Sequence, residues 1–199
     1  KPKEKDRQME ELVIATHNNH KAEEIKRLLD GKIKIVTLNE LGCKEEIPEE
    51  GETLKENALQ KAQYVWEKYH KNCFADDTGL MVDALNGEPG VYSARYAGEH
   101  CSFDDNINLL LDNMEGKTNR NARFETVICL IEDGKARYFE GKCEGCILTE
   151  RYGRGGFGYD PIFMPKGYGE SFAELSTEEK NKISHRGKAT AELIKYLLK

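Results

Sequence analysis

The stretch Phe124–Gly141, FETVICLIEDGKARYFEG, decides the fold class. Its strand-like halves, Phe124–Ile131 and Ala136–Gly141, flank Asp133-Gly134, a dipeptide that is the strongest short signal for a β-hairpin. Strands and helices interleave in the rest of the chain, which is typical of an α/β fold. Because the hairpin adds an antiparallel pair to that fold, we predict a mixed sheet flanked by helices.

Hydrophobic periodicity places the other elements around this hairpin. We predict strands at 12–15, 33–37 and 73–75, and helices at 22–29, 53–69, 102–114 and 189–198. Thr53 with Glu56, and Ser176 with Glu179, match the capping-box pattern at helix starts. A cleft between two lobes would bring together the chemically informative segments described below.

Composition excludes several classes of protein. The 199 residues carry a net charge of −6, which argues against a nucleic acid polymer as partner. No run of about 18 apolar residues is present, so we expect no membrane span and a cytoplasmic protein. Residues 1–10 are nearly all polar, and we interpret them as a disordered lead-in or expression remnant before a single domain at 11–199.

The six cysteines are too few, in so long a chain, for the disulfide framework of a small secreted protein. We therefore expect reduced thiols. Cys143 and Cys146 have CxxC spacing, but a structural zinc site needs a second matching pair of ligands, which the sequence lacks.

The segment Thr16-His17-Asn18-Asn19-His20-Lys21 joins the first predicted strand to the first helix. Unpaired backbone N–H groups at a helix start, the helix dipole and a lysine together form an anion site that suits phosphate. A structural interpretation is equally open, in which an asparagine caps the helix and Lys21 is a solvated charge.

Two acidic pairs are candidate ligands for Mg²⁺, which takes one or two carboxylates together with water and substrate phosphates. Asp76-Asp77 is predicted at the end of a buried strand, where adjacent carboxylates are costly unless a cation or caps neutralise them. Glu49-Glu50 precedes the helix at 53–69 and could equally belong to a solvated acidic loop. One carboxylate would also have to orient or deprotonate an attacking water.

Two groups of basic residues could meet a nucleotide. Lys61 lies one turn after Asn57 at the edge of an apolar helix face, where it either snorkels to solvent or enters a polar cleft. Lys180 and Ser184-His185-Arg186-Gly187 offer donors for the 6-oxo and N7 acceptors of hypoxanthine or xanthine, and would disfavour adenine. The alternative interpretation of the segment around Ser184-His185-Arg186 is a helix cap with surface charges.

The glycine-rich segment Gly153–Pro161, GRGGFGYDP, allows a ligand to approach the backbone closely. Phe157 and Tyr159 offer aromatic faces on which a base could stack, although an irregular turn with aromatic core residues is the alternative. The glycine spacing does not match a dinucleotide-binding fingerprint.

These motifs, in this order, resemble the inosine/xanthosine triphosphate pyrophosphatase family. The resemblance extends from Leu12 to Leu198 and is carried by ATHNNHK, EEGETLKENALQKA, FADDTGL, PGVYSARYAG, GGFGYDPIF and EEKNKISHRG. It implies an elongated, two-lobed α/β homodimer with a central cleft. It also implies magnesium-dependent cleavage of ITP, dITP and XTP between the α and β phosphates, which removes non-canonical purines from the nucleotide pool.

The resemblance further implies three groups of site residues. The triphosphate would be held by Thr16, Asn18, Lys21 and Lys61. The metal would be held by Glu49 and Asp77, with Asp77 also accepting the proton of the attacking water and Thr78 contacting substrate. The base would be oriented by Phe157, Gly158, Tyr159 and Asp160, and its oxo edge fixed by Lys180, His185 and Arg186.

Two departures from the family pattern bear on these assignments. The family often has glycine at the positions of His17 and His20, so the loop here is bulkier and both imidazoles, with Asn19, become candidate substrate contacts. Lys55 stands where the family often has an apolar or acidic residue, which leaves Glu50 as an alternative to Glu49; counting back from the glycine favours Glu49.

Two rival functions remain open. The first is a pyrophosphatase of similar fold that acts on modified pyrimidine nucleotides, although the FGYD and SHR segments of this sequence favour purine recognition. A nucleotide sensor would bind without turnover, but it has little reason to place Asp76-Asp77 beside an anionic ligand.

Overall fold

A computed structural model describes residues 11–199, and the predicted lead-in at 1–10 lies outside the described residues. The helices and strands are β1 (Glu11–Ile14), α1 (Asn19–Leu29), β2 (Lys34–Thr37), α2 (Leu54–Tyr69), β3 (Cys73–Val82), β4 (Pro89–Gly90), α3 (Phe103–Met114), β5 (Asn121–Glu132), β6 (Lys135–Ile147), β7 (Phe163–Pro165), α4 (Thr177–Ile183) and α5 (His185–Leu197). Short 3₁₀ helices span Asp83–Leu85, Ser93–Arg95 and Asp160–Ile162.

A seven-stranded mixed sheet organises the molecule, which confirms the prediction from the hairpin. Its strands lie in the order β2-β1-β3-β5-β6-β7, and β4 pairs with β3. β1 is parallel to β2 and β3, whereas β3, β5, β6 and β7 pair antiparallel. The β5–β6 hairpin turns at Asp133 and Gly134, whose positive φ angles of 49° and 83° suit the right-handed twist of the strands.

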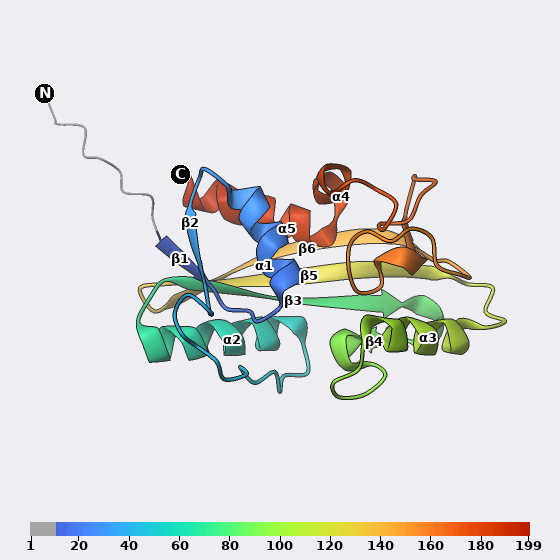
Figure 1. Cartoon of the computed structure of the whole chain (residues 1–199), viewed down its shortest axis with the longest axis horizontal. Coiled ribbons are helices and arrows are strands. Elements are labelled where there is room, and N and C mark those ends of the chain that lie inside the picture. Colours follow the sequence, from blue (N-terminus) through green and yellow to red (C-terminus); the bar gives the residue numbers. More distant parts are fainter. Residues whose placement is uncertain (1–10) are drawn as a thin grey trace, which may run out of the picture.

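Helices cover both faces of the elongated sheet (Figure 1). α1, α4 and α5 lie on one face, and α2 and α3 lie on the other, at different positions along its length. α1, α2, α3 and α5 each bury an apolar stripe, and the core accordingly forms three clusters, one beneath α2, one beneath α3 and one beneath α1 with α5. In α2 the buried positions Leu54, Ala58, Ala62 and Val65 follow the helical spacing seen in the sequence.

The helix caps are largely as predicted. Thr53 Oγ1 accepts a hydrogen bond from Glu56 N at 3.1 Å, which begins α2. The return bond differs, because Glu56 Oε2 accepts from Glu52 N rather than from Thr53 N. Ser102 and Asp105 form a complete capping box at α3.

The predicted strand end at Asp76-Asp77 is wrong. β3 continues to Val82 because β5 pairs with it along its whole length, from Cys73 opposite Ile131 to Val82 opposite Ala122. The two aspartates are therefore held by a central ladder. Successive side chains of a strand point to opposite faces, so their carboxylates reach different sides of the sheet.

The cysteines among residues 11–199 are all free thiols, as predicted. Cys143 and Cys146 both lie on β6, and their odd spacing directs them to opposite faces of the strand, which does not suit a shared zinc ion. Within the described part of the chain, no helix has the length and apolar character that a bilayer crossing requires.

Candidate active site

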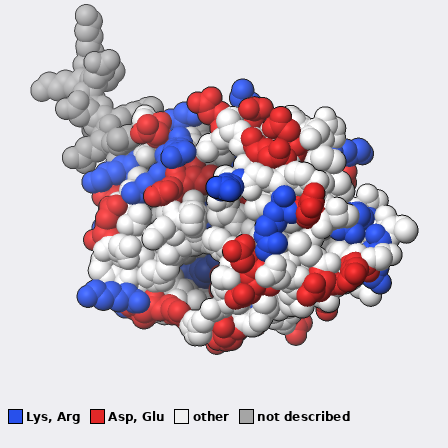
Figure 2. Space-filling view, turned by 45° about the vertical axis from the view of Figure 1, so that its right-hand side comes forward, with Lys and Arg blue, Asp and Glu red and all other residues white. Residues whose placement is uncertain are grey.

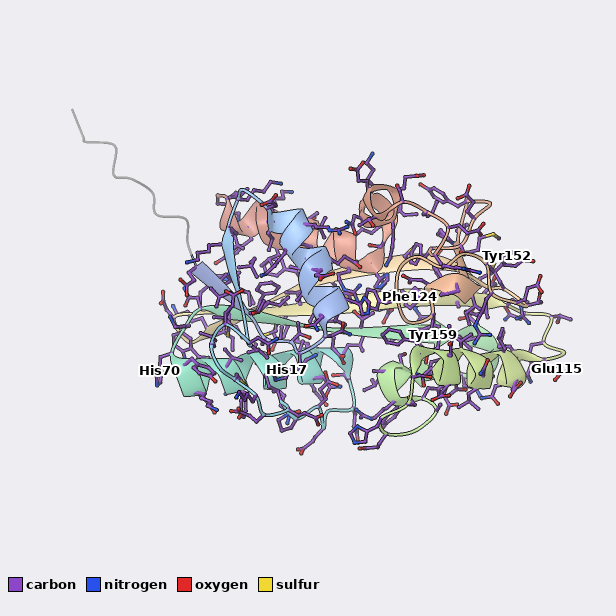
Figure 3. The ribbon with its side chains drawn as sticks, viewed as in Figure 1. His17, His70, Glu115, Phe124, Tyr152 and Tyr159 are labelled. Atoms are coloured by element: carbon purple, nitrogen blue, oxygen red, sulfur yellow. The ribbon has the colours of Figure 1, made fainter. Side chains whose placement is uncertain are left out.

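A cavity of about 390 Å³ opens beside β3, between the first turns of α1, α3 and α5 and the middle of α2. The predicted residues on its wall are Thr16, His17, Asn18, Lys21, Glu49, Lys61, Asp77, Thr78, Phe157, Gly158, Tyr159, Asp160, His185 and Arg186. Asn19, His20 and Lys180 are absent from the wall. Figure 3 shows His17, Phe124 and Tyr159 near the middle of the long axis, with His70 and Glu115 toward its two ends.

The loop between β1 and α1 forms one wall of the cleft. Asn18 caps α1, because its Oδ1 accepts a hydrogen bond from Lys21 N at 3.1 Å, so the capping interpretation holds for this residue. Lys21 is not a solvated charge. Its ammonium lies 3.4 Å from Asp76 Oδ2 in a buried position, and burial lowers the pKa of Lys21 despite that carboxylate. The loop therefore presents a fixed cation to the cleft.

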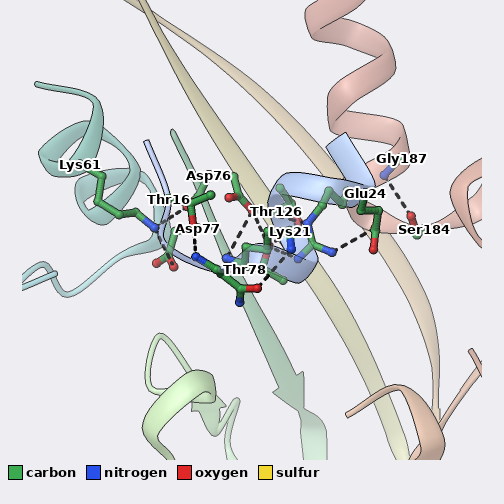
Figure 4. Close-up of polar contacts among 12 residues, drawn as sticks. Thr16, Lys21, Glu24, Lys61, Asp76, Asp77, Thr78, Thr126, Ser184 and Gly187 are labelled. Carbon is green, nitrogen blue, oxygen red and sulfur yellow. Dashed lines mark hydrogen bonds and ion pairs between the residues drawn. The ribbon is translucent and has the colours of Figure 1, made fainter. Parts of the chain in front are cut away.

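Asp77 and Glu49 share a cation on the α2 side of the sheet. Lys61 Nζ lies 2.6 Å from Glu49 Oε1. Figure 4 shows Lys61 beside the two aspartates, where its Nζ lies 4.0 Å from Asp77 Oδ1 and donates to the Asp76 carbonyl at 2.5 Å. Lys61 thus points into the cleft rather than snorkelling to solvent. Asn57 Nδ2 donates to Asp77 Oδ2 at 3.1 Å, which orients this carboxylate.

The pKa values of the two carboxyls differ in direction. Burial raises the pKa of Asp77, even though Lys61 and Lys21 oppose the shift. Burial also acts on Glu49, but the adjacent Lys61 outweighs it and leaves the pKa of Glu49 below its usual value. Asp77 is therefore the more basic of the two carboxylates and the better candidate to accept a proton.

A network of buried ion pairs joins α1, α4, α5 and the glycine-rich loop on the other side of the cleft. Glu24 contacts Arg186 Nη1 at 3.1 Å and Lys180 Nζ at 3.4 Å, and Lys180 contacts Asp160 Oδ2 at 2.7 Å. Arg186 Nε lies 3.6 Å from Asp76 Oδ2, which connects these ion pairs through Asp76 to Lys21. Lys180 is only 4% exposed and does not line the cleft, but it contacts Asp160, which does. This arrangement fixes the glycine-rich loop and α5 against α1.

The aromatic residues of the glycine-rich loop differ in position. Tyr159 is 5% exposed and donates its hydroxyl to the Ser93 carbonyl at 2.6 Å, so it is largely a core residue, as the structural alternative predicted. Phe157 is more open. Its backbone N–H donates to Asp160 Oδ2 at 3.1 Å.

His185 is a neutral donor or acceptor at the inner end of the cleft. Its ring stacks on Phe124 with centroids 4.5 Å apart, and it is 3% exposed. Burial, followed by the charge of Arg186, holds the pKa of His185 well below 6.5. Its Nδ1 is buried without a hydrogen-bond partner among the described residues.

Sequence reasoning missed several residues of the site. Phe103, Asn106 and Phe124 line the cleft, and Glu24 pairs with Arg186 on its wall and with Lys180 behind it. Only Glu24 had a usable signal, because it lies three residues after Lys21 and so on a shared helix face. On the surface shown in Figure 2, acidic and basic side chains are mixed, and basic atoms lie at the bottom of a hollow.

Comparisons with known proteins show which family this chain resembles. A model of the Ham1 family matches residues 12–196. The chain is 53% identical over 186 residues to a dITP/XTP pyrophosphatase of Flavobacterium psychrophilum, covering 94% of this chain and 98% of that protein. It is also 53% identical to a dITP/XTP pyrophosphatase of Porphyromonas gingivalis, covering 96% and 98%.

Solved structures show the same architecture. The chain superposes on a HAM1 protein from Coxiella burnetii with a TM-score of 0.87 and 39% identity, covering 96% of this chain and 99% of the other. The Staphylococcus aureus Ham1 protein gives a TM-score of 0.85 and 40% identity, with coverages of 94% and 98%.

Proposed function

The chain belongs to the Ham1 family, and on that premise we propose that it is a pyrophosphatase acting on non-canonical purine nucleoside triphosphates such as dITP, XTP and ITP. The products are the nucleoside monophosphate and pyrophosphate, and the nucleotide pool is thereby cleaned of deaminated purines. The observation that carries the proposal is the convergence of three chemistries on one cleft: cations at Lys21 and Lys61, carboxylates at Glu49 and Asp77, and a partly aromatic pocket ending at His185.

The donor set fits a magnesium ion. Glu49 and Asp77 both face the ammonium of Lys61, so their oxygens approach a common point, and both residues line the cleft. Mg²⁺ is usually held by one or two carboxylates, so water and substrate phosphates would supply its other ligands. Bound there, Mg²⁺ would neutralise charge on the phosphate oxygens. Glu50 is absent from the cleft wall, which supports Glu49 as the ligand.

Asp77 is the proposed proton acceptor. Its carboxylate is held in a fixed orientation by Asn57, which suits a general base. Water would lose its proton to Asp77 as its oxygen bonds to phosphorus, and the bond between the α and β phosphates would break. Lys21 and Lys61 would hold the charge of the departing pyrophosphate, with Thr16 and Asn18 shaping the loop around it.

Base selection is proposed at the inner end of the cleft. The neutral imidazole of His185 and the guanidinium of Arg186 line this end, and Arg186 Nη2 donates to Thr78 Oγ1 at 3.3 Å. Donors placed against a 6-oxo group would leave the amino group of adenine unpaired. Lys180 would act indirectly, by fixing Asp160 and the loop that carries Phe157.

A substrate panel tests the proposal. We expect dITP, XTP and ITP to be hydrolysed at least tenfold faster, in kcat/KM, than ATP, GTP and a modified pyrimidine triphosphate. A preference for the modified pyrimidine would support the first rival function. Tight binding of ITP without turnover in the presence of Mg²⁺ would support the sensor.

We also propose a cytoplasmic homodimer in which residues 11–199 form a single domain. The dimer follows from the family resemblance, and the single domain from one sheet that runs from β2 to β7. Sedimentation velocity at micromolar concentration tests the dimer, and a monomer of 22.7 kDa would contradict it.

A further inference from the structure

The proposed mechanism assigns no role to His17 or His20, and of these two histidines His20 is the one whose ring lies in an aromatic cluster. It is the second residue of α1, and its exposed ring meets rings from two distant segments. It stacks on Phe157 of the glycine-rich loop, with centroids 5.3 Å apart and planes at 16°, and lies 5.8 Å from Phe103 at the start of α3. Phe103 and Phe157 both line the cleft, so the three rings meet beside its mouth.

The ring of Phe157 is held between two kinds of neighbour. Lys180 Nζ and the guanidinium carbon of Arg186 each lie 5.0 Å from its centroid, and both residues are buried. His20 is exposed and therefore covers the solvent side of the ring. Gly156 and Gly158, on either side of Phe157, have φ angles of 68° and 61° and carry no side chains, so the neighbours of the ring come from other segments.

The other loop histidine behaves differently. His17 lines the cleft, and its Nε2 lies 2.7 Å from the Glu45 carbonyl oxygen. His20 is not on the cleft wall, and its ring is engaged with Phe157 and Phe103. The imidazoles of His17 and His20 therefore have different environments, although the sequence made both of them candidate substrate contacts.

We infer that His20 is a positioning residue for the nucleobase, an inference that rests on the proposed function. Its imidazole stacks on Phe157 and, with Phe103, holds that ring as a wall of the base pocket. It does not contact the phosphates. His20 thereby connects the first turn of α1, which follows the loop between β1 and α1, to the segments that surround the base.

The test compares a substrate that has a base with a ligand that lacks one. For wild type, His20→Ala and His20→Phe, we would measure KM and kcat for ITP and the inhibition constant of inorganic tripolyphosphate. We expect His20→Ala to raise KM roughly two- to tenfold, the range that one aromatic pair is worth. The kcat should stay within about twofold and the tripolyphosphate constant should not change. His20→Phe should restore KM, because it keeps the ring and removes the nitrogens.

His17→Ala is the matched control, since it removes an imidazole from the same loop without removing a ring from the cluster. We expect it to leave the ratio of the ITP KM to the tripolyphosphate inhibition constant unchanged. The inference is overturned if His20→Ala leaves this ratio at the wild-type value, or if tripolyphosphate binding weakens in parallel with KM. Failure of the wild-type protein to hydrolyse ITP would instead count against the proposed function. Thermal unfolding of each variant shows whether the fold is intact.

Discussion

Asp76 carries a stability prediction that separates it from its neighbour Asp77. Its carboxylate is fully buried, and Lys21 and Arg186 lie 3.4 Å and 3.6 Å from its Oδ2. Asp76→Asn would leave both cations without this partner. Removing one member of a buried ion pair costs about 3–5 kcal/mol, because the remaining charge stays desolvated and uncompensated. We expect the free energy of unfolding to fall by about that amount at pH 7.

Urea unfolding followed by circular dichroism measures this loss. Asp83→Asn is the matched control, because Asp83 pairs with Arg123 at 3.7 Å on the surface, where both side chains are more than 40% exposed. An exposed pair is worth about 0–1 kcal/mol. Equal losses for the two variants would refute the argument from burial.

The pH dependence gives a second check on Asp76. Lys21 and Arg186 outweigh burial and hold its pKa well below 3.8, so its stabilising effect is complete above that pH and is lost as the pH falls toward the folded-state pKa. The difference in the free energy of unfolding between wild type and Asp76→Asn should therefore be constant from pH 7 to pH 5 and become smaller below about pH 4. A difference that is already closing at pH 6 would contradict the assigned cause.

Three further outcomes follow from individual contacts. Gly141→Ala should destabilise the protein by about 1–3 kcal/mol, because a Cβ at this position would overlap the backbone of His185 at the start of α5. An unchanged midpoint of thermal unfolding would be inconsistent with that packing. Thr53→Ala should cost about 1 kcal/mol through the lost cap on Glu56 N, whereas Thr53→Ser should cost less, as chemical denaturation would show. The free energy of unfolding of His185→Phe should fall less steeply than that of wild type between pH 7 and pH 5. The reason is that the buried imidazole stays neutral in the folded protein, whereas in the unfolded chain it binds a proton near pH 6.5. Parallel curves of unfolding free energy against pH would contradict this.

Features fixed by local energetics could be predicted from the sequence. The Asp133-Gly134 turn and the Thr53 cap depend on neighbouring residues, and both are present. The length of β3 could not be predicted in this way. The segment from Asp76 to Gly79 has weak strand propensity, and pairing with β5, about 50 residues later in the chain, extends the strand.

The candidate site shows the same division. Motif resemblance indicated many of the residues that line the cleft, but it did not indicate the contacts that each side chain makes in the fold. Glu24 finds its cations 156 and 162 residues away, so its burial has no local cause. Tyr159 had an aromatic face suited to a base, and only the fold shows that its hydroxyl is bound to Ser93 in the core.

The measurement that tests the central claim most directly is product analysis of dITP hydrolysis with Mg²⁺, for wild type and Asp77→Asn. We predict that wild type releases one pyrophosphate for each dIMP, without orthophosphate. We predict that Asp77→Asn loses at least about a hundredfold in kcat, the lower end of what a general base supplies, while still binding dITP. Release of orthophosphate, or turnover by Asp77→Asn at the wild-type rate, would contradict the account.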